Sequence, residues 1–242
     1  MIVFLAILLI LSICLSGGLV YLGIKARTTG IPIFSSQYII NKKFFGESTD
    51  LRFWVTPNEY AIKKEAEKLK TDNPIATITG TYNFVEEGYI YEQDDLIVLN
   101  NGQIILRGGT DSWNLPLFTL AQKHQNGKIV VDCEDGTYFM ISLLRANGID
   151  AWANTGTITL NGSIYGHAWG TVIIEGKEYL LETTLGQSLV ELRPVPNFYK
   201  VDVKFNEKDF LTITGADINK QIYPHLPPAK IQDLKDALNN AS

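Results

Sequence analysis

The sequence predicts an α+β fold in which a central helix packs on an antiparallel sheet. A broadly apolar segment with helical spacing begins at Cys133 and ends at Asn147-Gly148. Three strand-like segments follow it, joined by turns short enough for hairpins. A helix followed by such a meander is typical of α+β domains. The chain has 242 residues, of which 45% are hydrophobic and 19% charged, so it can bury a full core.

The N-terminal segment predicts one transmembrane helix ahead of this fold. Residues 1–24 contain no charged side chain, and about 20 apolar residues suffice to cross a bilayer. The first positive charges, Lys25 and Arg27, follow this segment, so we expect a single-pass protein whose soluble domain is cytoplasmic. The alternative is a signal peptide cleaved near Ser16-Gly17-Gly18, after which the domain is exported.

Residues 25–50 are expected to be a tether, and residues 51–110 an N-terminal region with one helix and one β-hairpin. Thr56-Pro57-Asn58-Glu59 has the pattern of a capping box, which predicts a helix that ends at Asn73-Pro74. Asn100-Asn101-Gly102 separates two runs of aliphatic residues, as in a hairpin.

Residues 111–200 are expected to form the core domain, and residues 201–242 a C-terminal extension. A short helix is predicted after Pro116, and the wide apolar stripe of the helix from Cys133 suggests a buried, central position. The predicted strands of the core span Ala151–Leu160, Ser163–Ile174 and Glu178–Thr184. Two further strands and a terminal helix are predicted at Val201–Phe205, Phe210–Ile213 and Ala229–Asn239.

Cys133, His167 and Glu182 are the candidate catalytic residues. Cys133 lies at a helix start, where backbone N–H groups and the helix dipole favour a thiolate. His167 and Glu182 lie on two strands joined by the turn at Gly176, so they are near neighbours across an antiparallel pair. Glu182 can then accept from one imidazole nitrogen while the other faces the thiol, as in a nucleophile–base–acid triad.

Each of these residues also has a structural interpretation. A single cysteine is more often a small buried side chain, and a histidine beside Trp169 is more often packed than catalytic. The acidic residues around the thiol, Asp132, Glu134 and Asp135, stabilise a helix N-terminus in any case. All three features coincide in compatible elements and in a workable order, which favours a catalytic site.

These residues lie in segments that resemble the transglutaminase-like superfamily of papain-related cysteine enzymes. The similar segments are DCEDGTYFMISLLRANGIDAW, GHAW and YLLETT, within residues 111–186. The resemblance implies a papain-like core in which Cys133 is the nucleophile, His167 the base and Glu182 the acid. Two features depart from the family pattern. The acid is more often Asp, and a Gly–Asp pair more often stands where this chain has Val131-Asp132.

The oxyanion of the reaction needs hydrogen-bond donors. The backbone N–H of Cys133 is one candidate because it lies at a helix start. Trp113 or Asn114 is the candidate for the second donor, since a Trp has this role in some relatives.

No metal or other cofactor is expected, because His124, His167, His225 and Cys133 lack the spacing of metal ligands. The net charge of −5 and the lack of a basic stripe argue against a nucleic-acid partner.

The sequence therefore predicts a membrane-anchored, transglutaminase-like cysteine enzyme that forms a thioester on an amide or ester carbonyl of a protein or peptide. Hydrolysis, as by a peptidase or amidase, is preferred because the resemblance covers only a short catalytic core. The alternatives are acyl transfer that cross-links proteins, and a non-catalytic module that binds a peptide or protein.

Overall fold

The computed structural model describes residues 51–93, 96–98, 104–106, 113–186, 191–212 and 224–241. The predicted membrane anchor at residues 1–24 and the tether at residues 25–50 lie outside these ranges. Within them, no helix combines the length and the apolar character that a membrane span requires.

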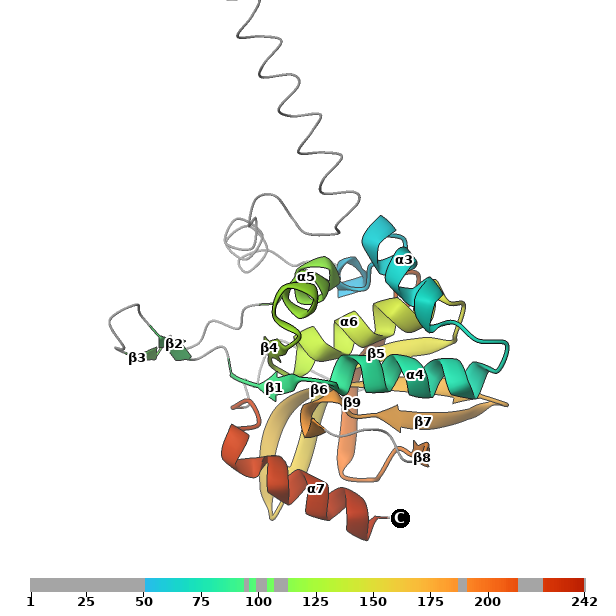
Figure 1. Cartoon of the computed structure of the whole chain (residues 1–242). Helices are drawn as coiled ribbons and strands as arrows, with labels where there is room; N and C mark the ends of the chain where they lie inside the picture. The colour runs from blue at the N-terminus through green and yellow to red at the C-terminus, as the bar shows by residue number, and fades with distance from the viewer. Residues whose placement is uncertain are drawn as a thin grey trace, which may run out of the picture.

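A six-stranded antiparallel sheet forms the centre of the domain, in the order β10-β9-β5-β6-β7-β8 (Figure 1). Its strands are β5 (Ala151–Leu160), β6 (Ser163–Ile174), β7 (Lys177–Leu181), β8 (Arg193–Pro194), β9 (Tyr199–Phe205) and β10 (Phe210–Thr212). The turns between β5, β6 and β7 contain residues with positive φ at Asn161, Gly162, Glu175 and Gly176, as two-residue hairpin turns require. The predicted α+β layout and antiparallel meander are thus confirmed.

The central helix α6 (Cys133–Ala146) packs on β5 and β6 and is buried from Cys133 to Leu144. Figure 1 shows the other helices of this layer around it, namely α3 (Tyr60–Leu69), α4 (Pro74–Glu86) and α5 (Pro116–Asn126). Gly170 of β6 permits the close approach of α6. A Cβ atom there would lie 2.7 Å from Met140 Cε, inside van der Waals contact.

A second apolar core lies on the other face of the sheet, where α7 (Ile231–Asn240) packs after the short helix η3 (Pro228–Lys230). Trp169, Tyr199 and Leu226 are buried there with Leu234 and Leu238 of α7. Because both faces are covered, β6 is apolar along much of its length rather than strictly alternating.

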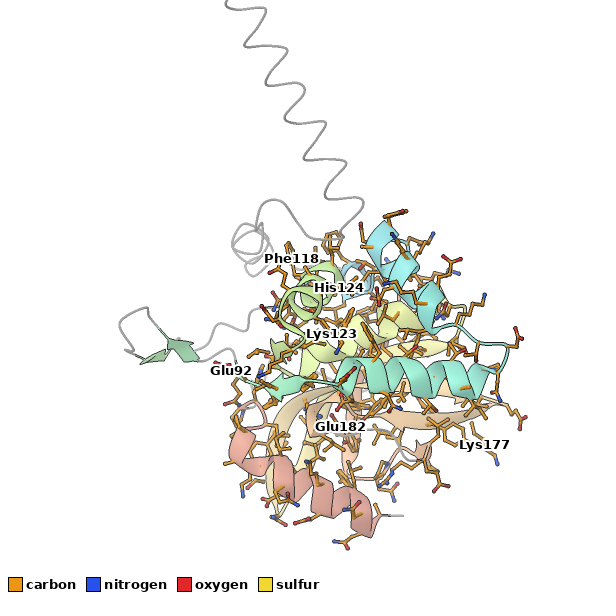
Figure 2. The ribbon with its side chains drawn as sticks, in the orientation of Figure 1. Glu92, Phe118, Lys123, His124, Lys177 and Glu182 are labelled. Carbon is orange, nitrogen blue, oxygen red and sulfur yellow. The ribbon has the colours of Figure 1, made fainter. Side chains whose placement is uncertain are left out.

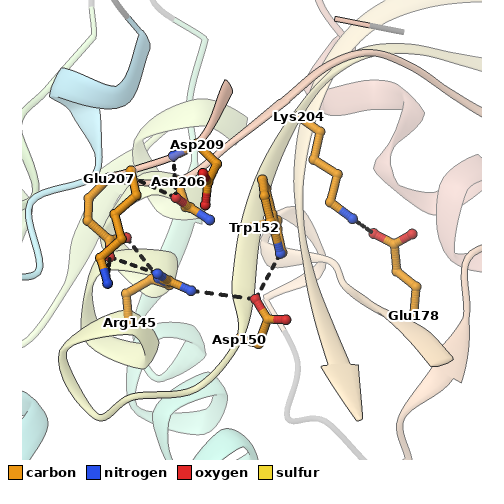
Figure 3. Close-up of polar contacts among 9 residues, drawn as sticks. Arg145, Asp150, Trp152, Glu178, Lys204, Asn206, Glu207 and Asp209 are labelled. Atoms are coloured by element: carbon orange, nitrogen blue, oxygen red, sulfur yellow. Dashed lines mark hydrogen bonds and ion pairs between the residues drawn. The ribbon is translucent and has the colours of Figure 1, made fainter. Parts of the chain in front are cut away.

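An ion-pair cluster joins the C-terminal end of α6 to the turn between β9 and β10 (Figure 3). Arg145 Nε and Nη2 donate to the two carboxylate oxygens of Glu207, each over 2.7 Å. Arg145 Nη1 also lies 3.5 Å from Asp150 Oδ1, just before β5. The two-pronged contact with Glu207 fixes the helix relative to the sheet edge.

The N-terminal helices differ from the prediction. The first helix begins at Tyr60, and its N-cap residue Glu59 makes no capping bond through its side chain, so the predicted capping box is wrong. The backbone N–H of Thr56 instead donates to Ser142 Oγ over 2.9 Å. The predicted helix ends at Leu69, before Asn73-Pro74. This dipeptide instead begins α4, where Asn73 Oδ1 accepts from two backbone N–H groups. Asn at the N-cap followed by Pro at the first helical position is a favourable start for a helix.

Short strands complete the structure. The predicted hairpin is present as β2 (Leu96–Val98) and β3 (Ile104–Leu106). A parallel pair, β1 (Tyr89–Tyr91) and β4 (Ile129–Val131), was not predicted. The strand predicted to end at Thr184 ends at Leu181, and the short helix η2 (Thr183–Leu185) follows. Short helix η1 (Leu51–Trp54) precedes α3.

Candidate active site

Cys133 is the first residue of α6 and follows β4 with one residue, Asp132, between them. The strand therefore fixes where the helix starts and where the thiol projects. Cys133 is only 2% exposed. Its Sγ donates a hydrogen bond to Glu134 Oε2 over 3.0 Å. The thiol thus lies at a helix N-terminus, beside the carboxylate of Glu134.

His167 of β6 is brought together with Glu182, as predicted from the hairpin. Pairing of β6 with β7 ends at Gly170 and Leu181, so Glu182 lies where the chain leaves the sheet. His167 Nε2 lies 2.9 Å from Glu182 Oε2, and both residues are buried. Figure 2 labels Glu182 in the interior of the domain, beneath α4.

Glu182 is held by several donors besides His167. Its Oε1 accepts from the backbone N–H of Thr184 over 3.1 Å and from its hydroxyl over 2.7 Å. Its Oε2 accepts from Tyr199 Oη over 2.6 Å. Tyr82 of α4 donates to the backbone carbonyl of Glu182. The carboxylate therefore has a fixed position from which to orient the imidazole.

The second ring nitrogen of His167 is the one available to the thiol. Nε2 contacts Glu182, whereas Nδ1 is buried and has no partner at ordinary hydrogen-bond geometry. The ring stacks on Trp169 with a centroid distance of 6.1 Å and an interplanar angle of 19°. Contact with Glu182 at Nε2 and with Trp169 on one face fixes the ring, and Cys133 is near enough to act on the imidazole.

The electrostatics favour a charged imidazole. Burial acts to lower the pKa of His167, but the charge of Glu182 and a hydrogen bond with Cys133 outweigh it and raise the pKa to about 10. Burial acts to raise the pKa of Glu182, yet the imidazolium holds it below its usual range. Sγ donates to Glu134 over 3.0 Å, and Nδ1 has no partner at ordinary hydrogen-bond distance and angle.

The acidic residues near the thiol are buried rather than solvated. Asp135 accepts from the backbone N–H of Asn114 over 2.5 Å and from its side-chain amide. Asp135 therefore positions the segment that precedes α5, and the Asn114 amide binds a carboxylate. Trp113 packs edge-to-face on Trp54 and Tyr138, with ring centroids 5.4 and 5.3 Å away. Its predicted part in the oxyanion site stays a prediction.

Three side chains with metal-ligand atoms lie together at this end of α6. Ligand atoms of Asp132, Glu134 and His225 all lie within 4.8 Å of one another. The sequence analysis expected no metal site from the spacing of histidine and cysteine alone. Two of these three possible ligands are carboxylates, which that spacing does not include. His225 comes from the segment before η3, which sequence spacing could not place here.

Sequence reasoning missed further residues around the site. Tyr82 and Tyr199, which hold Glu182, lie far from it along the chain, and no motif marks them. Tyr91 lies near the thiol: burial, and then the negative charge of Cys133, raises its pKa. Thr184 was within reach of sequence reasoning, because it lies two residues after Glu182 in the YLLETT segment.

Comparison with known proteins gives distant structural similarity only. No protein-family model matches the chain, and no curated protein matches it. Calcium-bound LapG of Legionella pneumophila is similar with a TM-score of 0.43 and 16% identity, over 84% of this chain and 98% of that one. Another LapG structure from the same organism has a TM-score of 0.45 and 15% identity, over 88% and 98%. A candidate cysteine protease from Cytophaga hutchinsonii has a TM-score of 0.42 and 17% identity, over 72% and 56%. The functional proposal therefore depends on the residues of this chain.

Proposed function

We propose that this chain is a cysteine peptidase or amidase of the transglutaminase-like class, with a papain-like core. Cys133 is the nucleophile, His167 the general base and acid, and Glu182 the residue that orients the imidazole. The observation that carries the proposal is the surroundings of the two ring nitrogens of His167. One nitrogen contacts a buried carboxylate over 2.9 Å, and the other is buried without an ordinary partner, beside the one thiol of the described chain.

In the first half of the reaction, Sγ attacks the carbonyl carbon of an amide as the thiolate, because its proton already lies on His167 Nδ1 in the ion pair. The carbonyl oxygen becomes an oxyanion, which the backbone N–H of Cys133 at the start of α6 stabilises. The C–N bond then breaks, and the leaving amine takes the proton from His167. A thioester between Cys133 and the acyl group remains.

In the second half, water attacks the thioester and gives a proton to His167. The C–S bond breaks and the acid product leaves. The proton stays on His167, so the thiolate–imidazolium pair is restored. An amine that takes the place of water gives acyl transfer by the same steps. Glu182 remains ionised throughout, because its charge favours the imidazolium that forms in both halves.

The membrane anchor is part of the proposal. Residues 1–24 would hold the domain at the membrane, with the catalytic core on the cytoplasmic face. Digestion of sealed, right-side-out vesicles that carry the full-length chain tests the orientation. A domain protected from added protease supports the cytoplasmic side, and a degraded domain contradicts it. A chain shortened near Ser16-Gly17-Gly18 supports the exported alternative.

Turnover by the full-length chain on a fluorogenic peptide library tests the catalytic proposal. Cys133→Ala should lower turnover at least about a thousand-fold, because the nucleophile is lost. Cys14→Ala is the matched control, since it removes the other cysteine and should leave turnover unchanged. If acyl transfer competes with hydrolysis, an added primary amine should give an amide product in place of the acid. Full turnover by Cys133→Ala would contradict the proposal, and a binding module shows no turnover in any variant.

A further inference from the structure

Cys133 and His167 are closed off from solvent, at 2% and 5% exposure. A substrate carbonyl cannot reach Sγ until some covering segment moves. The segment Pro224–Leu226, called the strap below, makes contacts on both sides of the thiol. Its contacts explain how the site is covered and where a substrate would bind.

On one side the strap pairs with the edge of β6. This strand pairs with β5 from Ser163 to Val172, but with β7 only from Gly170 to Ile174. Beside the rest of β6, the backbone N–H of Gly166 donates to the carbonyl of Pro224 over 2.9 Å. His225 forms a parallel bridge with Gly166. The strap therefore occupies the place of an additional strand, next to the residue that precedes His167.

On the other side the strap is bound by the end of β1. The carbonyl of Leu226 accepts from Tyr91 Oη over 2.7 Å and from Gln93 Nε2 over 3.0 Å. Between these two anchor points, a ring nitrogen of His225 lies within 4.8 Å of carboxylate oxygens of Asp132 and Glu134, the two neighbours of Cys133. The strap thus passes across the start of α6 from β6 to β1.

We propose that the strap occupies the position of an extended peptide substrate, so that this structure is the self-blocked form of the enzyme. A substrate strand pairs with Gly166 when the strap leaves, which places its backbone beside His167 and Cys133. Strand addition of this kind supplies affinity through main-chain hydrogen bonds and does not need a preformed pocket. This inference rests on the proposed function of Cys133.

Alkylation of Cys133 by iodoacetamide, measured by mass spectrometry on the full-length chain at pH 7, reports how often the strap is open. Gln93→Leu removes one of the strap's hydrogen bonds and should raise the alkylation rate about five-fold. Asn147→Leu is the matched control. It removes an amide-to-carbonyl bond to Ala66 at the far end of α6 and should leave the rate unchanged. Equal rates in the wild type and Gln93→Leu would overturn the proposal.

A competing peptide tests whether the vacated position accepts a strand. The blocked heptapeptide Pro-His-Leu-Pro-Pro-Ala-Lys, the sequence of residues 224–230, should slow alkylation of Gln93→Leu. The same peptide with Glu in place of His should not, because that residue would face Asp132 and Glu134. No protection by the first peptide would overturn substrate mimicry.

Hydrogen exchange of the Gly166 N–H separates failure of this inference from failure of the proposed function. Its exchange should be faster in Gln93→Leu than in the wild type, whether or not Cys133 is a nucleophile. Unchanged exchange would show that the strap does not leave β6, even if the triad is active. Faster exchange without any turnover would contradict the catalytic proposal alone.

Discussion

Replacing Glu182 by Gln removes the charge that stabilises the His167 imidazolium and keeps the size of the side chain. The raised pKa of about 10 for His167, against an ordinary value of 6.5, corresponds to about 5 kcal/mol of preference for the charged ring. Glu182 and Cys133 both contribute to this preference of His167 for the charged form. We expect Glu182→Gln to cost about 3 kcal/mol of unfolding free energy at pH 6, because it breaks a buried ion pair.

The sign of the pH dependence follows from the two pKa values. A raised pKa of His167 gives stability that is complete below about pH 6.5 and is lost as the pH rises towards about 10. The lowered pKa of Glu182 gives stability that is present above about pH 4.5 and is lost in acid. The wild type should therefore lose stability between pH 6.5 and 10, and Glu182→Gln should lose much less over that window.

Urea unfolding of both proteins at several pH values between 5 and 10 measures this difference. Tyr199→Phe is a control, because it removes one hydrogen bond to Oε2 but leaves the carboxylate in place. It should cost about 1 kcal/mol at every pH below the range where tyrosine ionises. Parallel pH profiles for the wild type and Glu182→Gln would refute the reasoning that Glu182 sustains a charged His167.

Three further predictions concern the surroundings of the site. Gly170→Ala should lower the unfolding free energy by about 1 kcal/mol at most, because its Cβ would meet the flexible end of Met140 at 2.7 Å and that side chain must shift. Gly80→Ala, with no atom within 4 Å, should not destabilise, and urea unfolding measures both. Glu134→Gln should speed alkylation of the thiol about ten-fold at pH 6, since a negative charge that opposes thiolate is removed. Arg145→Lys should cost about 1 kcal/mol in thermal unfolding, because Lys cannot make the two-pronged bond to Glu207.

Much of the core was predictable because its signals are local. The helix from Cys133 and the strands on either side of Asn161-Gly162 follow from periodicity and turn residues, which act over a few positions. The contact of His167 with Glu182 followed from counting across one hairpin, although β7 ends one residue before Glu182.

The elements that sequence reasoning missed depend on contacts between distant segments. Strands β1 and β4 have three residues each, too few for a periodic pattern, and they form only because they pair with each other. The approach of His225 to Gly166 joins segments 59 positions apart, through one isolated bridge. Such placement is set by tertiary packing, here the burial of Leu226 in the core beneath the sheet.

The pH dependence of Cys133 alkylation tests the central claim most directly. The full-length chain and His167→Ala are treated briefly with iodoacetamide from pH 5 to 8, and labelling of Cys133 is measured by mass spectrometry. The account predicts that the wild type is labelled at pH 6 much faster than His167→Ala, because the imidazolium stabilises the thiolate. The strap covers Cys133 in both proteins, so the comparison is between their rates and not with a free thiol. Labelling that follows an ordinary thiol titration near pH 8.5 in both proteins would contradict it.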